Sequence, residues 1–468
     1  MKVHWLLLII LSSLSLYAQD SLKTLEVETF LAWVKNYHPL AKQAALLDTE
    51  AKARLTLARG SFDPKLGGSF DQKVFKESNY YEIMNGSLKI PTWYGIELQG
   101  GYENTTGKYL GEEMTLPDDG LWAAGLKLSL GQGLFIDERR ANLKKAKVFQ
   151  DQNTYRQIQV LNELYRQASL SYWTWNANFN KAQVSEESYK IALDRFEQTK
   201  QSYIEGDKPA IDTLENYIQV QNRELQLAQS NQEFLTSQYH LNTFLWGDKN
   251  TPLELENSIK PAKLTSSISN KISPELIYKN INGLDTAHPK LLEMAAKLEQ
   301  MEIDQKLKKE YLKPQLDLKY NAIQSPGALL DINSDYLINN YKFGIDFNYS
   351  LFLRKERGKL KLGQIKIDYQ NLAIDQQELD LKNQISNSLQ RLENIKAQLN
   401  TANQVVDNYK RLLAGEHKKF EIGESSVFMV NKRESSLLKS QIKAIELKQK
   451  LQISYVDLLN KLGILYQL

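Results

Sequence analysis

The sequence predicts a mainly α-helical protein with β-strands, built from two copies of one unit. A His-Pro pair at 38–39 precedes Pro64 by 26 residues, and a second pair at 288–289 precedes Pro314 by the same 26. A stretch of alternating residues rich in Gly and aromatic side chains follows each of these spans. A proline-free helical segment of about 67 residues comes next in each copy. The predicted order is therefore short helix, strands and long helical hairpin, present twice.

The first 18 residues have the features of a secretory signal peptide. Lys2 supplies the positive charge, Trp5 to Leu11 form the apolar core, and Ala18 ends a small-residue cleavage site. This apolar run is too short to span a bilayer, so we expect residues 1–18 to be removed. The chain has no cysteine. An exported protein without disulfides depends on a large core or on oligomerisation.

Composition and motifs exclude several classes of function. The formal net charge of the 468 residues is +3, which argues against a general nucleic-acid binder. No histidine pair has metal-ligand spacing, and no phosphate-binding loop or nucleophile elbow occurs. His38 and His288 occupy matching positions before a proline, which indicates a structural role. We expect no enzyme activity, no metal and no cofactor.

The first element of each copy is a helix between two prolines. We expect these helices over residues 34–61 and 289–311, since a helix usually ends at or before the residue that precedes a proline. The prolines mark the helix starts and the helix–strand junctions: Pro39 and Pro289 for the starts, Pro64 and Pro314 for the junctions.

The strands follow in the regions of about 64–131 and 314–352. Segments such as AGLKLSLGQ and QLDLKYNA alternate with the period of two that a half-buried strand requires. The first region is longer by an insert over 76–120, which is either a long loop or an additional hairpin. Pro91 inside the insert predicts an edge strand or a turn. The number of strands therefore stays open at this point.

Each copy ends in a long helical hairpin, over 137–245 and 354–462. A helix of about 67 residues is roughly 100 Å long at 1.5 Å per residue. The hairpins turn at Gly206 and Gly423, which are 217 residues apart. Apolar residues of the first return helix fall on a seven-residue repeat typical of a coiled-coil seam: Ile211, Leu214, Ile218, Leu225, Ala228 and Leu235. The seam fits an isolated hairpin or a wall in which each helix has partners on both sides.

The domain organisation follows from the duplication. We expect a signal peptide over 1–18, a first repeat over 19–246 and a second repeat over 285–468. Residues 247–284 form a linker, or equatorial segment, between the repeats.

The duplicated order resembles the TolC family of outer-membrane efflux proteins, the outer membrane factors. Its markers are HP at the short helix, P-x-L entering a strand, LxxGLF and YSLF before the long helix, and an aromatic-x-x-Gly turn. The resemblance covers nearly the whole mature chain. It implies a homotrimer in the cell outer membrane whose chains each give at least four strands, about twelve in total, to a shared β-barrel. It also implies that the helical hairpins form a tunnel in the periplasm.

The resemblance implies a function and partners as well. The trimer would be the exit duct of a tripartite efflux or type I secretion system, with a periplasmic adaptor and an inner-membrane pump. Outer-membrane lipid would surround the barrel, and no nucleic acid is involved. Trp93, Tyr94 and Trp122 would then lie at the bilayer interfaces or in a packed core.

The family's periplasmic aperture is lined by acidic residues six and sometimes nine positions after the tip glycine. Counted from Gly206, these positions are Asp212 and Glu215. The second repeat has Met429 and Lys432 there, which departs from the acidic pattern. Lys432 either pairs with one of the two carboxylates across the aperture, or all four are ordinary solvated helix residues.

The hairpin tips are the expected adaptor-docking points. The turns contain Gly206-Asp207 and Gly423-Glu424, and glycine permits the positive φ that a helix end requires. The alternative is that these residues only cap helices.

Two other functions are consistent with parts of the sequence. A periplasmic adaptor also has a coiled-coil hairpin, but it would have one hairpin between split β-rich domains and usually a membrane anchor. A structural coiled-coil envelope protein without transport activity would not need duplicated strands.

Overall fold

The computed structural model describes residues 24–256, 258–264, 283–326 and 338–467. The predicted signal peptide and much of the predicted linker lie outside these ranges. The chain divides into two compact units. Unit 1 combines residues up to 45 with 157–288 and 379–468, and unit 2 combines 46–156 with 289–378. Each unit thus contains parts of both predicted repeats, and the division into repeats stays a prediction.

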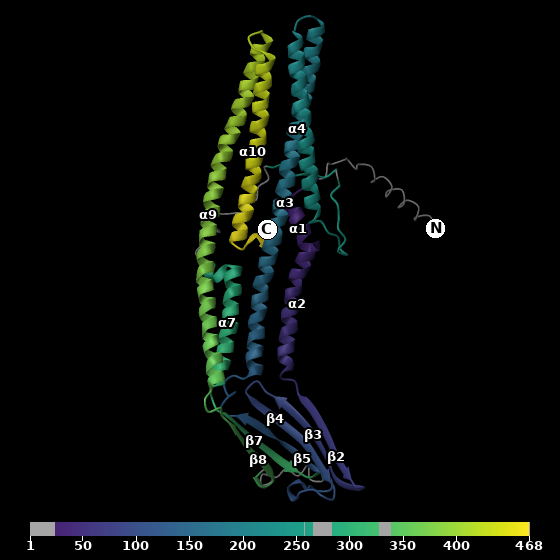
Figure 1. The fold of residues 1–468 in the computed structure, drawn as a ribbon, viewed down its shortest axis with the longest axis vertical. Coiled ribbons are helices and arrows are strands. Elements are labelled where there is room, and N and C mark those ends of the chain that lie inside the picture. Colours follow the sequence, from purple (N-terminus) through teal and green to yellow (C-terminus); the bar gives the residue numbers. More distant parts are fainter. Residues whose placement is uncertain (1–23, 257, 265–282, 327–337, 468) are drawn as a thin grey trace, which may run out of the picture. The chain divides into compact units, whose positions relative to one another are not determined.

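Unit 2 contains one antiparallel sheet of six strands in the order β2-β3-β4-β5-β7-β8 (Figure 1). The first repeat supplies four strands and the second supplies two, joined where β5 pairs with β7. The strands are β2 Lys65–Phe75, β3 Ser78–Pro91, β4 Ile96–Thr106, β5 Leu121–Ser129, β7 Gln315–Gln324 and β8 Tyr341–Asn348. Much of the insert is therefore additional strand rather than a long loop.

Of the two alternatives for Pro91, an edge strand or a turn, the edge strand is wrong and the turn directly follows Pro91. Strand β3 pairs with β2 on one side and with β4 on the other, so it is central. Pro91 is its last residue, directly before a turn that ends at Gly95 with φ +82°. A proline at a strand end removes no donor from the middle of the ladder, and a central strand tolerates it there.

The two faces of the sheet differ in polarity. On one face the cross-strand neighbours are Leu98, Leu126, Tyr320 and Phe343. The opposite face carries ion pairs between strands: Lys127–Asp317 at 3.0 Å, Lys319–Asp346 at 2.5 Å and Lys342–Glu103 at 2.6 Å. Large apolar side chains remain exposed on the first face of the single chain, and such a surface needs an apolar medium or a partner to cover it.

Helices pack on one another next to this sheet. The unit contains most of α2 (Pro39–Gly60) and all of α7 (Pro289–Glu310). It also contains α3 (Glu138–Ile204) up to residue 156 and α9 (Arg354–Glu421) up to residue 378. One core is formed by Ile136, Ala141, Val148, Ala296, Ile303 and Leu307. A second contains Ala58, Phe62, Leu143 and Ala146.

The expected helix over 34–61 is two helices. Helix α1 spans Val27–Tyr37, and α2 begins at Pro39. His38 between them has φ −67° and ψ 134°, an extended conformation. The residue before a proline is disfavoured in the helical region, so the helix breaks there. The second repeat has the same arrangement, since α6 (Leu284–Ala287) ends before His288 and α7 follows.

Unit 1 contains most of the two long hairpins (Figure 1), namely α3 from residue 157, α9 from residue 379, and both return helices. Their helices are α3 Glu138–Ile204, α4 Ala210–Asn242, α9 Arg354–Glu421 and α10 Val427–Lys461. A small parallel strand pair, β1 Thr24–Leu25 with β6 Lys260–Pro261, completes unit 1. Short 3-10 turns cover Leu465–Gln467 in unit 1 and Glu112–Met114 in unit 2. Trp173 and Trp175 are fully buried in the core of unit 1. Mainly α structure with long hairpins and one sheet confirms the predicted fold class.

In the described ranges, no helix combines the length and the apolar character needed to cross a membrane.

The apolar seam of the return helix α4 is exposed in the single chain. Ile211 is 64% exposed and Leu225 is 71% exposed. The buried positions on α4 are instead largely polar: Asn216, Arg223, Ser230 and Ser237 recur every seven residues. The hairpin therefore packs through a polar seam, and the apolar stripe is left for surfaces outside this chain. This finding favours a wall in which each helix has partners on both sides over an isolated hairpin.

Candidate functional site at the hairpin tips

The two hairpin tips have the same backbone geometry. Gly206 has φ +86° and Gly423 has φ +80°. The amide of Asp207 donates to the Ser202 carbonyl at 2.9 Å, and that of Glu424 donates to the Lys419 carbonyl at 2.8 Å. These bonds reach back five residues, as in a Schellman helix end. No heavy atom lies within 4 Å of an added Cβ at either glycine, so only the backbone conformation requires glycine.

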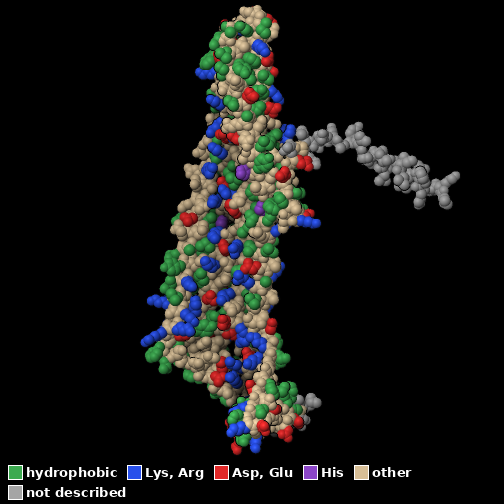
Figure 2. Space-filling model, turned by 45° about the vertical axis from the view of Figure 1, so that its right-hand side comes forward, with side chains coloured by type: hydrophobic (Ala, Val, Ile, Leu, Met, Phe, Trp, Pro, Cys, Tyr) green, Lys and Arg blue, Asp and Glu red, His purple; other side chains and the backbone are tan. Residues whose placement is uncertain are grey.

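Apolar side chains are uncovered around both turns. Ile204 and Ile422 are exposed by about two thirds of their surface, and Ile211 and Phe428 by more than half. The hydrophobic colouring at the upper end of Figure 2 marks this region. Lys208 of one tip lies 4.9 Å from the ring centre of Phe420 in the other hairpin. Exposed apolar side chains at the end of a polar rod are typical of a protein-contact surface.

The predicted aperture residues lie on the first turns of the return helices. Asp212, Glu215 and Met429 are half-buried, and Lys432 is exposed. In the described part of this single chain, the two carboxylates and the Lys432 ammonium take part in no hydrogen bond or ion pair. The predicted Lys432–carboxylate pair is therefore not formed within one chain, and the role of these residues at an aperture stays a prediction.

A buried polar network lies close to these positions and joins the two hairpins. Arg195 on α3 forms a two-pronged ion pair with Glu434 on α10, in which one N–O distance is 2.6 Å. The same guanidinium donates to the Asn431 side chain at 3.1 Å. Asn431 is adjacent to the predicted residue Lys432. Bidentate Arg–carboxylate pairs are among the stronger protein hydrogen bonds.

The network continues into α4. The Asn431 amide donates to the Asn216 side chain at 3.0 Å, and Asn216 donates to the Thr199 hydroxyl at 2.7 Å. Arg223 donates to the Ser435 hydroxyl at 2.7 Å. Three helices are thus linked by side chains that are almost fully buried: Asn216, Arg223 and Asn431 are each no more than 6% exposed.

Positive charge exceeds negative charge in this network. Burial lowers the pKa of the Arg223 guanidinium, nearby Glu434 raises it, and nearby Arg195 lowers it. The imidazole of His417 lies 3.9 Å from the same Glu434 carboxylate. Among these partners Glu434 is the one carboxylate: it pairs with Arg195, and its charge favours the charged form of Arg223.

A second polar contact closes the α9–α10 hairpin near its tip. Glu416 on α9 accepts a hydrogen bond from Ser425 at 2.5 Å and from Arg433 at 3.2 Å. These two bonds, Ser425 first, lower the pKa of the Glu416 carboxyl.

Sequence analysis missed the polar network. A signal for it existed, because Asn216, Arg223, Ser230 and Ser237 have the seven-residue spacing expected for a buried seam. That spacing was assigned to the apolar stripe instead, since polar residues are usually the exposed ones.

The two matched histidines have structural contacts away from the tips. The amide of Leu40 donates to the His38 ring at 3.2 Å, and the His288 ring contacts the Lys461 carbonyl at 3.2 Å. Burial lowers the pKa of His38 and lowers that of His288 to about 4. Each ring therefore stays neutral while it holds the start of a short helix or the end of a return helix.

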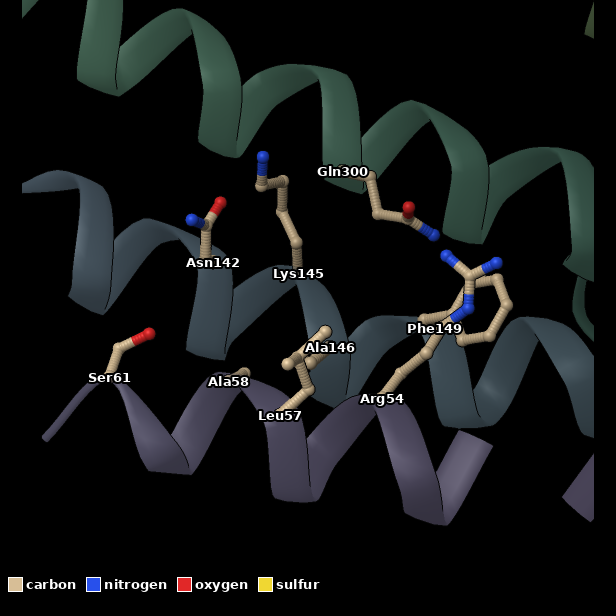
Figure 3. A pocket seen from close by; sticks show the side chains of 9 residues that line it. All are labelled: Arg54, Leu57, Ala58, Ser61, Asn142, Lys145, Ala146, Phe149 and Gln300. Atoms are coloured by element: carbon tan, nitrogen blue, oxygen red, sulfur yellow. The ribbon is translucent and has the colours of Figure 1, made fainter. Parts of the chain in front are cut away.

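A groove of about 330 Å³ lies between α2, α3 and α7 (Figure 3). The Arg54 guanidinium lies 4.3 Å from the Phe149 ring centre and pairs with Glu50 at 2.8 Å. Lys145 pairs with Asp304 at 2.8 Å. No carboxylate or histidine lines this groove. The described residues also hold no cluster of three His, Cys, Asp or Glu side chains suited to a metal ion.

The model of the outer membrane efflux protein family matches residues 281–464, almost all of the predicted second repeat. A search of curated protein sequences found no match.

Solved structures of similar fold cover nearly the whole chain. The CmeC outer membrane channel of Campylobacter jejuni has a TM-score of 0.62 and 14% identity, over 94% of this chain and 86% of that one. The outer membrane protein VceC of Vibrio cholerae has a TM-score of 0.65 and 12% identity, over 93% and 96%. The open state of the MtrE outer membrane channel of Neisseria gonorrhoeae has a TM-score of 0.66 and 13% identity, over 94% and 89%. At these identities the likeness establishes the fold.

Proposed function

We propose that this chain, a member of the outer membrane efflux protein family, is the exit duct of a tripartite efflux or type I secretion system. The family match over residues 281–464 and the fold confirm the resemblance seen in the sequence, and they support an outer-membrane efflux channel with a large periplasmic portion. The sheet with one exposed apolar face and one polar, ion-paired face carries the proposal. Strands that separate lipid from an aqueous bore have this alternation.

The duct forms from three copies of the chain. Strands β2 and β8 are the two unpaired edges of the sheet, and open edges are a liability unless another strand covers them. Pairing β8 of one copy with β2 of the next leaves no edge. Six strands per chain give about 18 in the trimer rather than about twelve, a number that leaves an aqueous channel. The exposed apolar stripe on α4 is available for further contacts outside the chain.

The polar network at the hairpin tips holds the periplasmic gate closed, and we call it the latch. Arg195, Asn216 and Arg223 belong to the first hairpin, whereas Asn431, Glu434 and Ser435 belong to the second. Widening the tunnel at its tip requires the hairpins to separate, and these contacts oppose that movement. Rings of Asp212 and Glu215 carboxylates at the aperture attract cations and repel one another. The latch then holds the closed state against that repulsion.

The tips are the docking points for a periplasmic adaptor, and an inner-membrane pump supplies the substrate. The uncovered side chains of Ile204, Ile211, Ile422 and Phe428 support this role. Docking at both turns of each of three chains would offer six similar sites. Adaptor contact there would act directly on helices that the latch holds together.

The test is conductance of the purified mature protein in a planar lipid bilayer, together with heat-modifiable migration as a trimer. A trimer that conducts ions in discrete steps supports the duct. A protein that is monomeric, stays out of the outer-membrane fraction and does not conduct refutes it and favours a structural coiled-coil protein.

A further inference from the structure

The helix ends next to the sheet are strongly basic. Segments 59–65, 137–147, 306–313 and 354–366 together contain 17 Lys and Arg against five Asp and Glu. The whole chain has 59 basic and 56 acidic residues, so acidic residues outnumber basic ones everywhere else taken together. We call these four segments the basic belt. Charge segregation of this size on a nearly neutral chain indicates a partner of opposite charge.

All four segments of the basic belt lie at the same end of the sheet. Each directly precedes or follows a strand: α2 leads into β2, β5 into α3, α7 into β7, and β8 into α9. The opposite end of the sheet differs, since the loop over 107–120 has Lys108 as its one basic residue and four acidic residues. The blue side chains in Figure 2 gather on the helices near the sheet.

Most of the belt charges are free to meet an external partner. Twelve of its cations are exposed and, within the described residues, form no ion pair: Arg59, Lys65, Lys144, Lys147, Lys306, Lys309, Arg354, Lys355, Arg357, Lys359, Lys361 and Lys366. The paired members are the less exposed ones, such as Arg140 with Asp137 at 3.4 Å. In the part of the chain that the structure describes, ion pairs therefore do not account for these exposed cations.

Apolar anchors lie at the same level as the basic belt. Phe135 and Phe352 stand at the matching strand–helix transitions and are 72% and 71% exposed. Lys313 lies 4.4 Å from the Phe135 ring centre and Arg354 lies 5.2 Å from that of Phe352. Tyr94, in the β3–β4 turn at this end of the sheet, is 83% exposed. Aromatic rings beside cations are typical of the boundary between lipid tails and headgroups.

We propose that the basic belt binds the anionic headgroups of phospholipids in the membrane leaflet on the side of the helices. The inference rests on the proposed position of the sheet in the membrane. The apolar sheet face would meet the lipid tails, the aromatic rings the interface, and the long Lys and Arg side chains would reach the phosphates. Such an attraction falls off within a Debye length of about 8 Å at physiological salt, so only lipids in direct contact respond.

The test measures lipid preference of the full-length mature trimer. The protein is reconstituted in phosphatidylcholine vesicles with a trace of spin-labelled phosphatidylglycerol or spin-labelled phosphatidylcholine. Electron paramagnetic resonance then gives the ratio of their association constants. We expect about fivefold preference for phosphatidylglycerol at low ionic strength, which is the factor expected for one Lys or Arg near a headgroup. The preference should fall towards one as sodium chloride is added.

A matched pair of variants identifies the surface. The belt variant carries R354Q, K355Q, R357Q, K359Q and K361Q at the sheet end of α9. The control variant removes five charges from the far part of the same helix through R391Q, K410Q, R411Q, K418Q and K419Q. We expect the belt variant to lose most of the preference and the control to keep it. Equal preference in the belt variant and the wild type overturns the proposal.

Two further readouts separate the possible failures. Sodium phosphate that abolishes the preference more strongly than sodium chloride at the same ionic strength indicates a discrete phosphate site and overturns lipid binding. Equal effects of the two salts support a lipid surface. Conductance of the same preparations tests the proposed function separately. A conducting trimer without lipid preference refutes only the proposal that the basic belt binds lipid. A lipid-binding trimer that never conducts refutes only the proposal that the chain forms a duct.

Discussion

Replacing Glu434 by Gln tests whether the polar network holds the gate closed. The substitution keeps the size of the side chain and removes its charge. Arg195 then loses the partner of its two-pronged pair. Arg223 also loses the carboxylate that favours its charged form. The side chains of Arg195 and Glu434 are only 15% and 11% exposed, so water cannot replace the lost partner without a rearrangement.

The expected effect is large because charges are left buried without compensation. Removing one partner of a buried ion pair typically costs about 3–5 kcal/mol. Some of that cost is relieved if the hairpins separate and water reaches the guanidinium groups. If the open state avoids about 3 kcal/mol of this destabilisation, the equilibrium between closed and open states shifts towards opening by a factor of about 150 per chain. We therefore expect E434Q to open a channel whose wild type is mostly closed.

The assay is single-channel recording of both proteins at neutral pH, scored as open probability and conductance. E393Q is the matched control. It removes one carboxylate from α9, where Glu393 is 71% exposed and pairs with Lys396 at 2.9 Å. Exposed pairs contribute about 0–1 kcal/mol, so E393Q should behave as wild type.

One result would refute the latch. If E434Q remains a heat-modifiable trimer and has the open probability of wild type, the network does not oppose opening. If E434Q fails to assemble, the double variant R195Q/E434Q decides the question, because it removes the paired Arg195 and Glu434 charges together. A trimeric double variant that stays closed like wild type would equally contradict the latch.

Three further outcomes are expected. The folded-state pKa of His288 lies near 4, below its usual 6.5, so the folded protein binds fewer protons and loses stability as pH falls from about 6.5 to 4. The difference between the denaturant midpoints at pH 7 and 5 should be smaller in H288Q than in wild type, and the lowered pKa of His38 leaves part of it in the variant. G423A should cost about 1–2 kcal/mol because of its φ of +80°, whereas G358A, in the helical interior of α9 with open space around it, should stabilise by up to about 1 kcal/mol in thermal unfolding. D212A should reduce cation over anion selectivity in bilayer reversal potentials; unchanged selectivity would remove Asp212 from the aperture.

The long helices could be predicted from the sequence because their local signals are strong and consistent. The helical segments of about 67 residues expected to begin at 137 and 354 are helices Glu138–Ile204 and Arg354–Glu421. Proline is absent from both, and a glycine with positive φ ends the turn that follows. Local signals of this kind act within a few residues and do not depend on distant contacts.

The strand count could not be predicted because it depends on pairing between distant residues. The insert over 76–120 has turn residues and alternation, which fit a loop or a hairpin equally. The choice is made by the neighbours: β3 lies between β2 and β4, β4 lies between β3 and β5, and β5 gains its second partner through β7 of the second repeat. Alternation does show which side chains share a face once the strand is formed.

The polar network near the hairpin tips could not be predicted from the sequence, for a different reason. A hydrophobicity pattern on α4 points to Ile211, Ile218 and Leu225 as the seam. The chain instead buries the polar residues at the same spacing. Asn216, Arg223 and Ser230 find partners on other helices, and Ser237 donates to a carbonyl of α4 itself. A buried polar group without such a partner would be costly, and the partners lie hundreds of residues away in the sequence or across the hairpin turn.

Helix α4 buries polar side chains and leaves its apolar stripe exposed, which gives a physical reason why the wall of the tunnel can open. An apolar seam that separates must expose apolar surface to water, and the cost rises with the area. A seam of hydroxyl, amide and guanidinium groups exchanges its hydrogen bonds for bonds to water when it separates, and the net contribution of each bond is small. The contacts made by Asn216, Ser230 and Arg223 are therefore specific enough to fix one closed arrangement but weak enough to release. The apolar stripe carried by Ile211, Ile218 and Leu225 remains on the outside, where a partner helix that moves together with α4 can cover it in both states.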